Sequence, residues 1–73
     1  MSMAVEIPAH ITGTIWKIEK RKGDAVSEGD VLVILESMKM EMPLEAPENG
    51  VVQDVRCSEG QAVQEGDVLM VIG

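Results

Sequence analysis

The residues that could do chemistry in this chain lie in one short segment, Glu36-Ser37-Met38-Lys39-Met40-Glu41. Lys39 supplies an amine, which is a nucleophile once it is deprotonated. Glu36 and Glu41 supply two carboxylates that could act as a general acid and a general base. Without a pocket around them, these carboxylates are better interpreted as solvated charges or as charges that face a partner enzyme. The amine is therefore the main candidate for chemistry.

Cysteine and histidine contribute little to the chemistry that this sequence could support. Cys57 is the only cysteine and His10 the only histidine, so the sequence has no disulfide or zinc framework. One distant histidine is the only possible base for the thiol. We therefore interpret Cys57 as a small, buried or half-buried hydrophobic residue. His10 is interpreted as a partly exposed residue at a strand end.

Length and charge exclude several classes of protein. With 73 residues the chain holds one domain, expected to span residues 1–73. Its net charge of −7 disfavours nucleic acid as a partner, because phosphate binding needs a basic surface. There is no run of about 18 apolar residues, so no membrane span is predicted. The segment Met1-Ser2-Met3-Ala4 lacks the regions of a signal peptide, which predicts a cytoplasmic protein or one processed in an organelle matrix.

The strongest internal signal is a repeat. The second half of the chain matches the first when it is shifted by 37 residues, which places Gly50 on Gly13. Residues 65–69 then repeat residues 28–32 letter for letter, as Glu-Gly-Asp-Val-Leu. Solenoids need about three or more copies for stability. Two copies that fill the chain instead predict two halves that bury their apolar faces against each other.

Each half has the pattern of β-strands. Residues 31–35 and 68–72 are apolar and rich in β-branched side chains, which is typical of buried strands. Residues 14–20 and 51–57 mix apolar and charged side chains, which suits strands with one wet face. The sequence therefore predicts an all-β fold, a flattened β-barrel (barrel-sandwich hybrid) of two four-stranded sheets with pseudo-twofold symmetry. Because Trp16 is the only aromatic residue, the core must consist of Val, Ile, Leu, Ala and Met.

Lys39 lies between the two copies, in a segment that belongs to neither. A connection between halves related by a twofold axis is a natural place for an exposed hairpin tip. Two-residue hairpin turns favour Asn-Gly or Asp-Gly, so a Met-Lys turn departs from local preference, as expected where function overrides propensity. Met38, Met40 and Met42 could form the inward face of a strand. Alternatively, the methionines beside Lys39 form an adaptable apolar surface that a partner enzyme grips.

These residues resemble the biotinyl domains of biotin-dependent carboxylases and the related small biotin/lipoyl attachment proteins. The resemblance covers nearly the whole chain, from Val5 to Ile72, and centres on the run Met38-Lys39-Met40, which is similar to the attachment motif of that family. It implies that biotin is the cofactor, attached covalently to Lys39, with Met38 and Met40 as recognition flanks. The remaining motif residues are Glu36, Ser37 and Glu41.

The resemblance also implies what the domain does. A biotin protein ligase activates biotin as its adenylate, and the lysine amine attacks the adenylate to form an amide. A lysine amine is protonated at neutral pH, so the ligase must first remove its proton. The domain is then a non-catalytic carrier whose arm moves a carboxyl group from a biotin carboxylase site to a carboxyltransferase site. No insertion lies between Lys20 and Gly23, so the protruding thumb of some bacterial carriers is not expected.

Two other functions stay open on the sequence. A lipoyl carrier shares the fold and the lysine position, but it commonly has Asp before the lysine and Ala after it, so Met38 and Met40 favour biotin. A module of the same fold could serve protein contacts alone, with Lys39 unmodified. A free-standing enzyme has almost no support.

Overall fold

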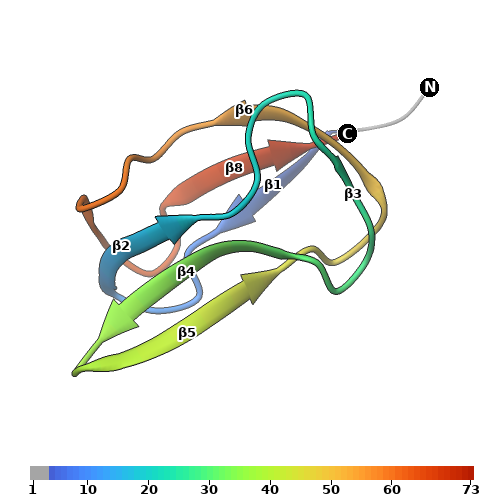
Figure 1. Cartoon of the computed structure of the whole chain (residues 1–73). Helices are drawn as coiled ribbons and strands as arrows, with labels where there is room; N and C mark the ends of the chain where they lie inside the picture. Colours follow the sequence, from blue (N-terminus) through green and yellow to red (C-terminus); the bar gives the residue numbers. More distant parts are fainter. Residues whose placement is uncertain (1–3) are drawn as a thin grey trace.

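Aliphatic and β-branched residues determine where the strands lie. The computed structural model describes residues 4–73, and in that range the chain forms eight β-strands and no helix (Figure 1). The two predicted buried runs lie in β4 and β8, and the two mixed runs correspond to β2 and β6, which end at Ile18 and Val55. The strands are β1 (Val5–Pro8), β2 (Gly13–Ile18), β3 (Ala25–Val26), β4 (Val31–Ser37), β5 (Met40–Glu45), β6 (Gly50–Val55), β7 (Ala62–Val63) and β8 (Val68–Ile72).

The strands form two four-stranded antiparallel sheets, with the orders β1-β8-β6-β3 and β5-β4-β2-β7. Each strand of the first sheet has its counterpart at the same place in the second: β1 corresponds to β5, β8 to β4, β6 to β2 and β3 to β7. A twofold relation between the two copies requires this correspondence. The predicted all-β fold of two four-stranded sheets is confirmed. However, neither copy of the repeat forms a sheet by itself. Each sheet combines two strands from the first copy with two from the second.

The symmetry extends to individual hydrogen bonds. Asp30 and Asp67 are related by the 37-residue shift, and the carboxylate of each accepts a hydrogen bond at 2.8 Å from the amide three residues earlier. Their carbonyl oxygens accept hydrogen bonds, also at 2.8 Å, from the amides of Ala46 and Ala9 respectively. Each aspartate therefore closes its own turn and ties that turn to the other copy of the repeat.

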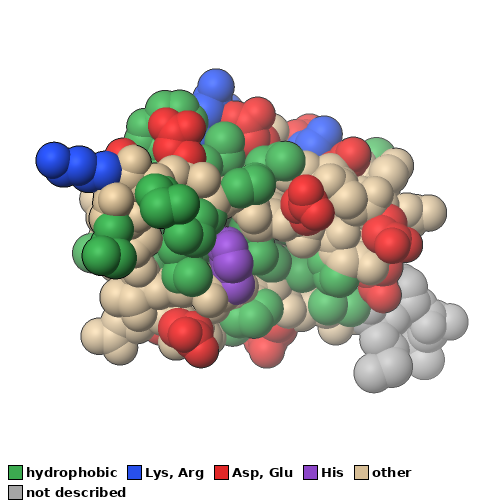
Figure 2. All heavy atoms as spheres, turned by 90° about the horizontal axis from the view of Figure 1, so that it is seen from below, with side chains coloured by type: hydrophobic (Ala, Val, Ile, Leu, Met, Phe, Trp, Pro, Cys, Tyr) green, Lys and Arg blue, Asp and Glu red, His purple; other side chains and the backbone are tan. Residues whose placement is uncertain are grey.

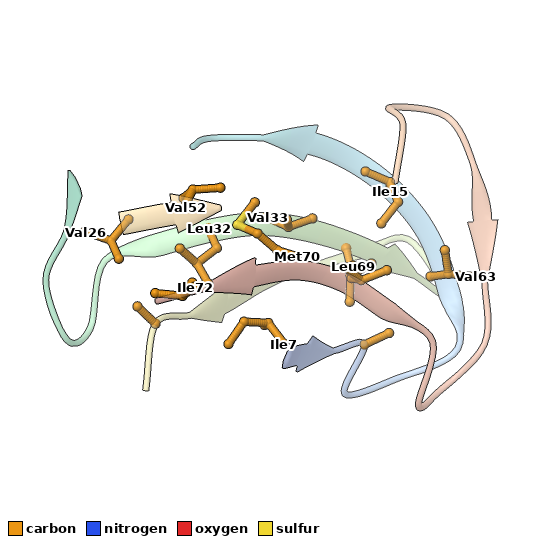
Figure 3. Close-up of a cluster of buried hydrophobic side chains, with 13 residues drawn as sticks. Ile7, Ile15, Val26, Leu32, Val33, Val52, Val63, Leu69, Met70 and Ile72 are labelled. Atoms are coloured by element: carbon orange, nitrogen blue, oxygen red, sulfur yellow. The ribbon is translucent and has the colours of Figure 1, made fainter. Parts of the chain in front are cut away.

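The core fills the space between the two sheets with aliphatic side chains (Figure 3). None of the buried side chains in residues 4–73 is polar or charged, and Trp16 lies on β2 with 47% of its surface exposed. The predicted aliphatic core is confirmed, and its burial from water is the main stabilising contribution to such a small domain. The buried core residues are Ile7, Ala9, Ile15, Val26, Leu32, Val33, Leu35, Ala46, Val52, Val63, Leu69, Met70 and Ile72.

The domain is elongated, with principal extents of 39 × 18 × 16 Å. The β4–β5 hairpin forms one end, and β8 finishes beside the start of β1 at the other (Figure 1). Within residues 4–73, we find no helix long and apolar enough to cross a membrane. The chain's midpoint and the paired ends of β1 and β8 thus lie at opposite poles of the barrel.

Candidate functional site

The β4–β5 hairpin places Met38 and Lys39 in a two-residue turn. Leu35 pairs with Met42, and the pairing continues outward until the last pair of the ladder, Ser37 with Met40. The two residues between that last pair have φ angles of 53° at Met38 and 64° at Lys39. Positive φ at both central residues defines a type I′ turn, whose twist matches that of the flanking strands. The predicted hairpin tip is confirmed.

This turn is the one place in the described chain where residues other than glycine adopt positive φ. Gly23, Gly29, Gly60 and Gly66 have φ between 87° and 95°, at no steric cost. A side chain in the left-handed region costs roughly 1–2 kcal/mol, because Cβ approaches the following carbonyl oxygen. The hairpin ladder on either side holds Met38 and Lys39 in this conformation. Strain of this kind persists where the surrounding structure enforces it, and it is concentrated at functional sites.

The side chains of the tip lie in solvent. Met38 is 91% exposed and Met40 59% exposed, and Lys39 is exposed between them. Met42, which lies two residues further along β5, is half-buried. In Figure 2 a basic side chain projects from the hairpin end of the molecule, beside hydrophobic side chains. The alternative that Met38 and Met40 form the inward face of a strand is therefore wrong, whereas Met42 fits it in part.

The carboxylates of the segment do not form a catalytic pair in a pocket. Glu36 and Glu41 are a cross-strand pair on the hairpin, and both are exposed. Like charges that face each other across a ladder repel weakly in solvent. The ion pairs found among residues 4–73 involve neither of them, nor Lys39. This arrangement leaves the amine accessible and gives the two carboxylates the character of solvated charges.

A cavity of about 430 Å³ lies away from the hairpin tip. It opens between the ends of β2 and β6, where Ile18 and its symmetry counterpart Val55 form part of its lining. Ile18 pairs with Val33 in the middle of β4, so the cavity is remote from Lys39 along the sheet. It contains none of residues 36–41, and it supplies no pocket for chemistry at the tip.

Gly13 supports the base of the hairpin, a role that the sequence did not reveal. A Cβ built on Gly13 would lie 2.5 Å from the carbonyl oxygen of Glu36 and 3.4 Å from Cβ of Ser37. Only glycine therefore lets β2 approach β4 closely at the point where the hairpin leaves the barrel. The alignment of Gly13 with Gly50 in the repeat was the signal that could have indicated a packing requirement there.

The other singled-out residues lie away from the tip. His10 is exposed two residues after β1 ends, in agreement with a residue at a strand end. Cys57 is half-buried and packs against the core, and burial raises the pKa of its thiol. Both findings agree with the predictions for these residues. No group of three or more potential metal ligands is present in the described part of the chain.

The fold and the tip together define a class: a small β-barrel attachment domain that presents one lysine on a strained, exposed turn. The family model described as "Biotin-requiring enzyme" matches residues 3–72, and the chain belongs to this family. Biotin, covalently attached, is its cofactor. The residues at the tip fit such a group, because an exposed primary amine with no ion-pair partner among residues 4–73 can be joined to a carboxylic acid without unfolding the barrel.

Individual proteins show the same likeness. The chain is 46% identical over 44 residues to the biotinylated protein TB7.3 homolog of Mycolicibacterium smegmatis. The aligned segment covers 60% of this chain and 62% of that protein. The urea carboxylase of Kluyveromyces lactis superimposes with a TM-score of 0.91 and 34% identity, over 100% of this chain and 6% of the carboxylase. A single-chain, multi-domain long-chain acyl-CoA carboxylase gives a TM-score of 0.89 and 34% identity, over 93% of this chain and 7% of that protein. The match thus spans about three fifths of the first relative and a small part of each carboxylase.

Proposed function

We propose that Lys39 is the biotin attachment residue and that the domain carries a carboxyl group between a biotin carboxylase site and a carboxyltransferase site. The observation that carries this proposal is the exposed lysine in a type I′ turn that glycine would normally occupy. Membership of the biotin family and the likeness to two carboxylases support it. In this function the domain is a non-catalytic carrier, and its site of action is cytoplasmic or in an organelle matrix.

Attachment requires little of the domain beyond its geometry. A biotin protein ligase would activate the carboxyl group of biotin as an adenylate, and the Lys39 amine would attack that carbon, releasing AMP and a proton. The new amide removes the positive charge from the tip. Bound biotin supplies a ureido nitrogen that can accept and release a carboxyl group. The hairpin keeps the attachment point outside the barrel, so the arm can enter the active sites of other proteins.

The flanking side chains have separate roles in the proposal. Met38 and Met40 offer an unbranched, adaptable apolar surface on either side of the amine, which suits contact with the ligase. Ser37, half-buried against Gly13, closes the ladder below the turn. Glu36 and Glu41 give the base of the hairpin a negative charge that faces the partner.

The mass of the intact protein tests the attachment residue. Co-expression with a biotin protein ligase should add one biotin per chain, and Lys39→Arg should abolish the addition because arginine is not acylated in its place. Lys22→Arg is the matched control, since Lys22 is also exposed and lies beside a positive-φ turn residue, Gly23. Both variants should keep the stability of the wild type within about 0.5 kcal/mol, as surface substitutions usually do.

Other outcomes of the same experiment would replace the proposal. Addition of lipoate under balanced supply of both acids would make the domain a lipoyl carrier. A chain that neither ligase modifies would be an interaction module of the same fold. For the flanks, Met38→Asp combined with Met40→Ala should slow biotin addition without unfolding the domain. An unchanged rate would show that the methionines play no part in recognition.

A further inference from the structure

The four methionine side chains that the structure describes differ widely in their access to solvent. Met38 is 91% exposed and Met40 59% exposed, at the tip of the hairpin. Met42 is half-buried on β5, and Met70 is 0% exposed in the core, on β8. The two most accessible thioethers of this set therefore flank Lys39 directly. The same thioether group is therefore found at every degree of solvent exposure within one small domain, from almost fully exposed to fully buried.

Exposure decides how readily a thioether reacts with a peroxide. The sulfur lone pair attacks one peroxide oxygen, the O–O bond breaks, and the second oxygen leaves as water after proton transfer. The sulfur is oxidised by two electrons to a sulfoxide and the peroxide is reduced. The product is polar and chiral where the thioether was apolar and flexible, and methionine sulfoxide reductases can reverse the change. A core sulfur such as that of Met70 is shielded from the oxidant until the barrel opens.

We propose that Met38 and Met40 form a reversible oxidation site that controls acylation of Lys39. Peroxide converts both residues to sulfoxides while Met70 stays reduced, and the oxidised tip is a poorer acceptor for the biotin ligase. This inference rests on the proposed function, because it assumes that the ligase contacts the two methionines. It goes beyond that function by making the redox state of the tip a determinant of whether the carrier is loaded.

The barrel itself is not altered by oxidation at these two positions. Neither Met38 nor Met40 belongs to the buried core or to the residues packed against it. A sulfoxide at either position therefore stays in solvent in the free domain. Its cost arises only when a partner covers it, since a polar group that is desolvated without a hydrogen bond destabilises the complex. The effect is therefore on recognition and not on folding.

Trypsin makes the oxidation measurable residue by residue. In the unmodified protein, cleavage after Lys22, Lys39 and Arg56 releases three peptides that separate the described methionines. Peptide 23–39 carries Met38, peptide 40–56 carries Met40 and Met42, and peptide 57–73 carries Met70. Treatment of the folded, unmodified chain with hydrogen peroxide should oxidise Met38 first, then Met40, then Met42, with Met70 last. Fragment spectra of peptide 40–56 distinguish its two methionines.

The treated protein is then offered to biotin protein ligase with biotin and ATP. The initial rate of biotin addition should fall by about tenfold, the factor expected for desolvating one poorly paired polar group. Incubation with methionine sulfoxide reductases of both stereospecificities should restore the rate. A Met38→Leu/Met40→Leu variant is the matched control. Its rate after treatment is compared with its own rate before treatment and should not change, although Met42 is still exposed to the oxidant.

The outcomes separate this inference from the function on which it rests. If the untreated chain accepts no biotin, the proposed function fails and the inference fails with it. If the untreated chain accepts biotin and the rate is unchanged once both tip methionines are sulfoxides, only the inference is overturned. Oxidation of Met70 as fast as Met38 would also overturn it, because the selectivity of the site depends on the difference in exposure.

Discussion

The two ends of the barrel are related by the pseudo-twofold axis, yet among the described residues only one of them presents an exposed turn with a lysine. At one end β4 continues through the Met38-Lys39 turn into β5, and at the other β8 finishes at Ile72 beside the start of β1. A glycine lies at the base of each end, Gly13 against Glu36 and Gly50 against Ile72. The two glycines occupy corresponding positions of the repeat, but among the described residues a hairpin turn is present at one end alone.

This comparison shows how a duplicated fold acquires a single site. Each copy has an aspartate-closed turn and one mixed strand, because both copies must bury an apolar face. The Met-Lys turn has no counterpart in the repeat and is the only described turn in which side chains are forced to positive φ. The symmetric features therefore serve stability, and the residue that we propose for attachment lies where the symmetry is broken.

Substituting Gly13 and Gly50 should have the largest effect on the free energy of unfolding. The two substitutions together test whether the two ends of the barrel are packed equally tightly. For Gly13→Ala we expect a loss of about 3 kcal/mol in the free energy of unfolding, since the new methyl meets a backbone oxygen at 2.5 Å. For Gly50→Ala we expect about half that loss, because its nearest obstacle at 2.6 Å is a side-chain methyl of Ile72 and the backbone oxygen of Gly73 lies further off, at 3.3 Å. Urea unfolding followed by Trp16 fluorescence measures both.

A Gly13→Ala domain as stable as the wild type would contradict the close approach of β2 to the hairpin. Equal losses at the two positions would mean that the side chain of Ile72 is as rigid an obstacle as a carbonyl group. In either case the hairpin end would not be the more tightly constrained of the two.

Replacing the turn itself should have a smaller effect of opposite sign. The double substitution M38N/K39G introduces the residues that a type I′ turn favours, and it should stabilise the domain by about 1 kcal/mol. Thermal unfolding should show a higher Tm for this variant. Met38→Asn alone, which keeps the lysine, should give part of the gain.

A loss of stability in M38N/K39G would mean that Met38 and Lys39 are not strained, and the contrast with the glycine turns would disappear. A gain in stability, together with loss of biotin addition, would show that the wild-type turn sacrifices stability for an acylable amine.

The smallest expected effect concerns Cys57, which lies on the body of the barrel and not at either end. Desolvation by burial raises the pKa of this thiol, so the folded state disfavours the thiolate. At low pH the thiol is neutral in both the folded and the unfolded state, so it makes no pH-dependent contribution to stability there. As the pH rises through the unfolded value, about 8.5 for a free thiol, the unfolded state ionises first and stability is lost until the folded pKa is passed.

Comparing the wild type with Cys57→Ala isolates this contribution. The wild type should lose stability relative to the variant as the pH rises above the pKa of a free thiol, about 8.5. Iodoacetamide should alkylate the folded thiol more slowly than the unfolded one. An identical pH dependence in the two proteins would show that the half-buried site does not distinguish thiol from thiolate.

Much of the architecture could be predicted from local patterns. The runs that became β4 and β8 were recognisable because uninterrupted aliphatic residues at this length favour a buried strand. The repeat predicted the twofold relation, and its midpoint predicted an exposed Lys39. The inward-facing alternative for the three methionines could not be decided, since a spacing of two fits either face of a strand. The role of Gly13 was also out of reach, because its obstacle is a backbone atom 23 positions away, on Glu36.

Residue types and their spacing along the chain were enough to predict the all-β class, the aliphatic core, the duplication and the segment that holds the amine. The three-dimensional arrangement was needed to establish that each sheet takes two strands from each copy, that Met38 and Lys39 adopt positive φ, and that Met40 is exposed while Met42 is half-buried. These properties depend on which strands pair and in what register. Strand pairing and register are set by contacts between residues far apart in the chain, so they cannot be predicted from a local pattern.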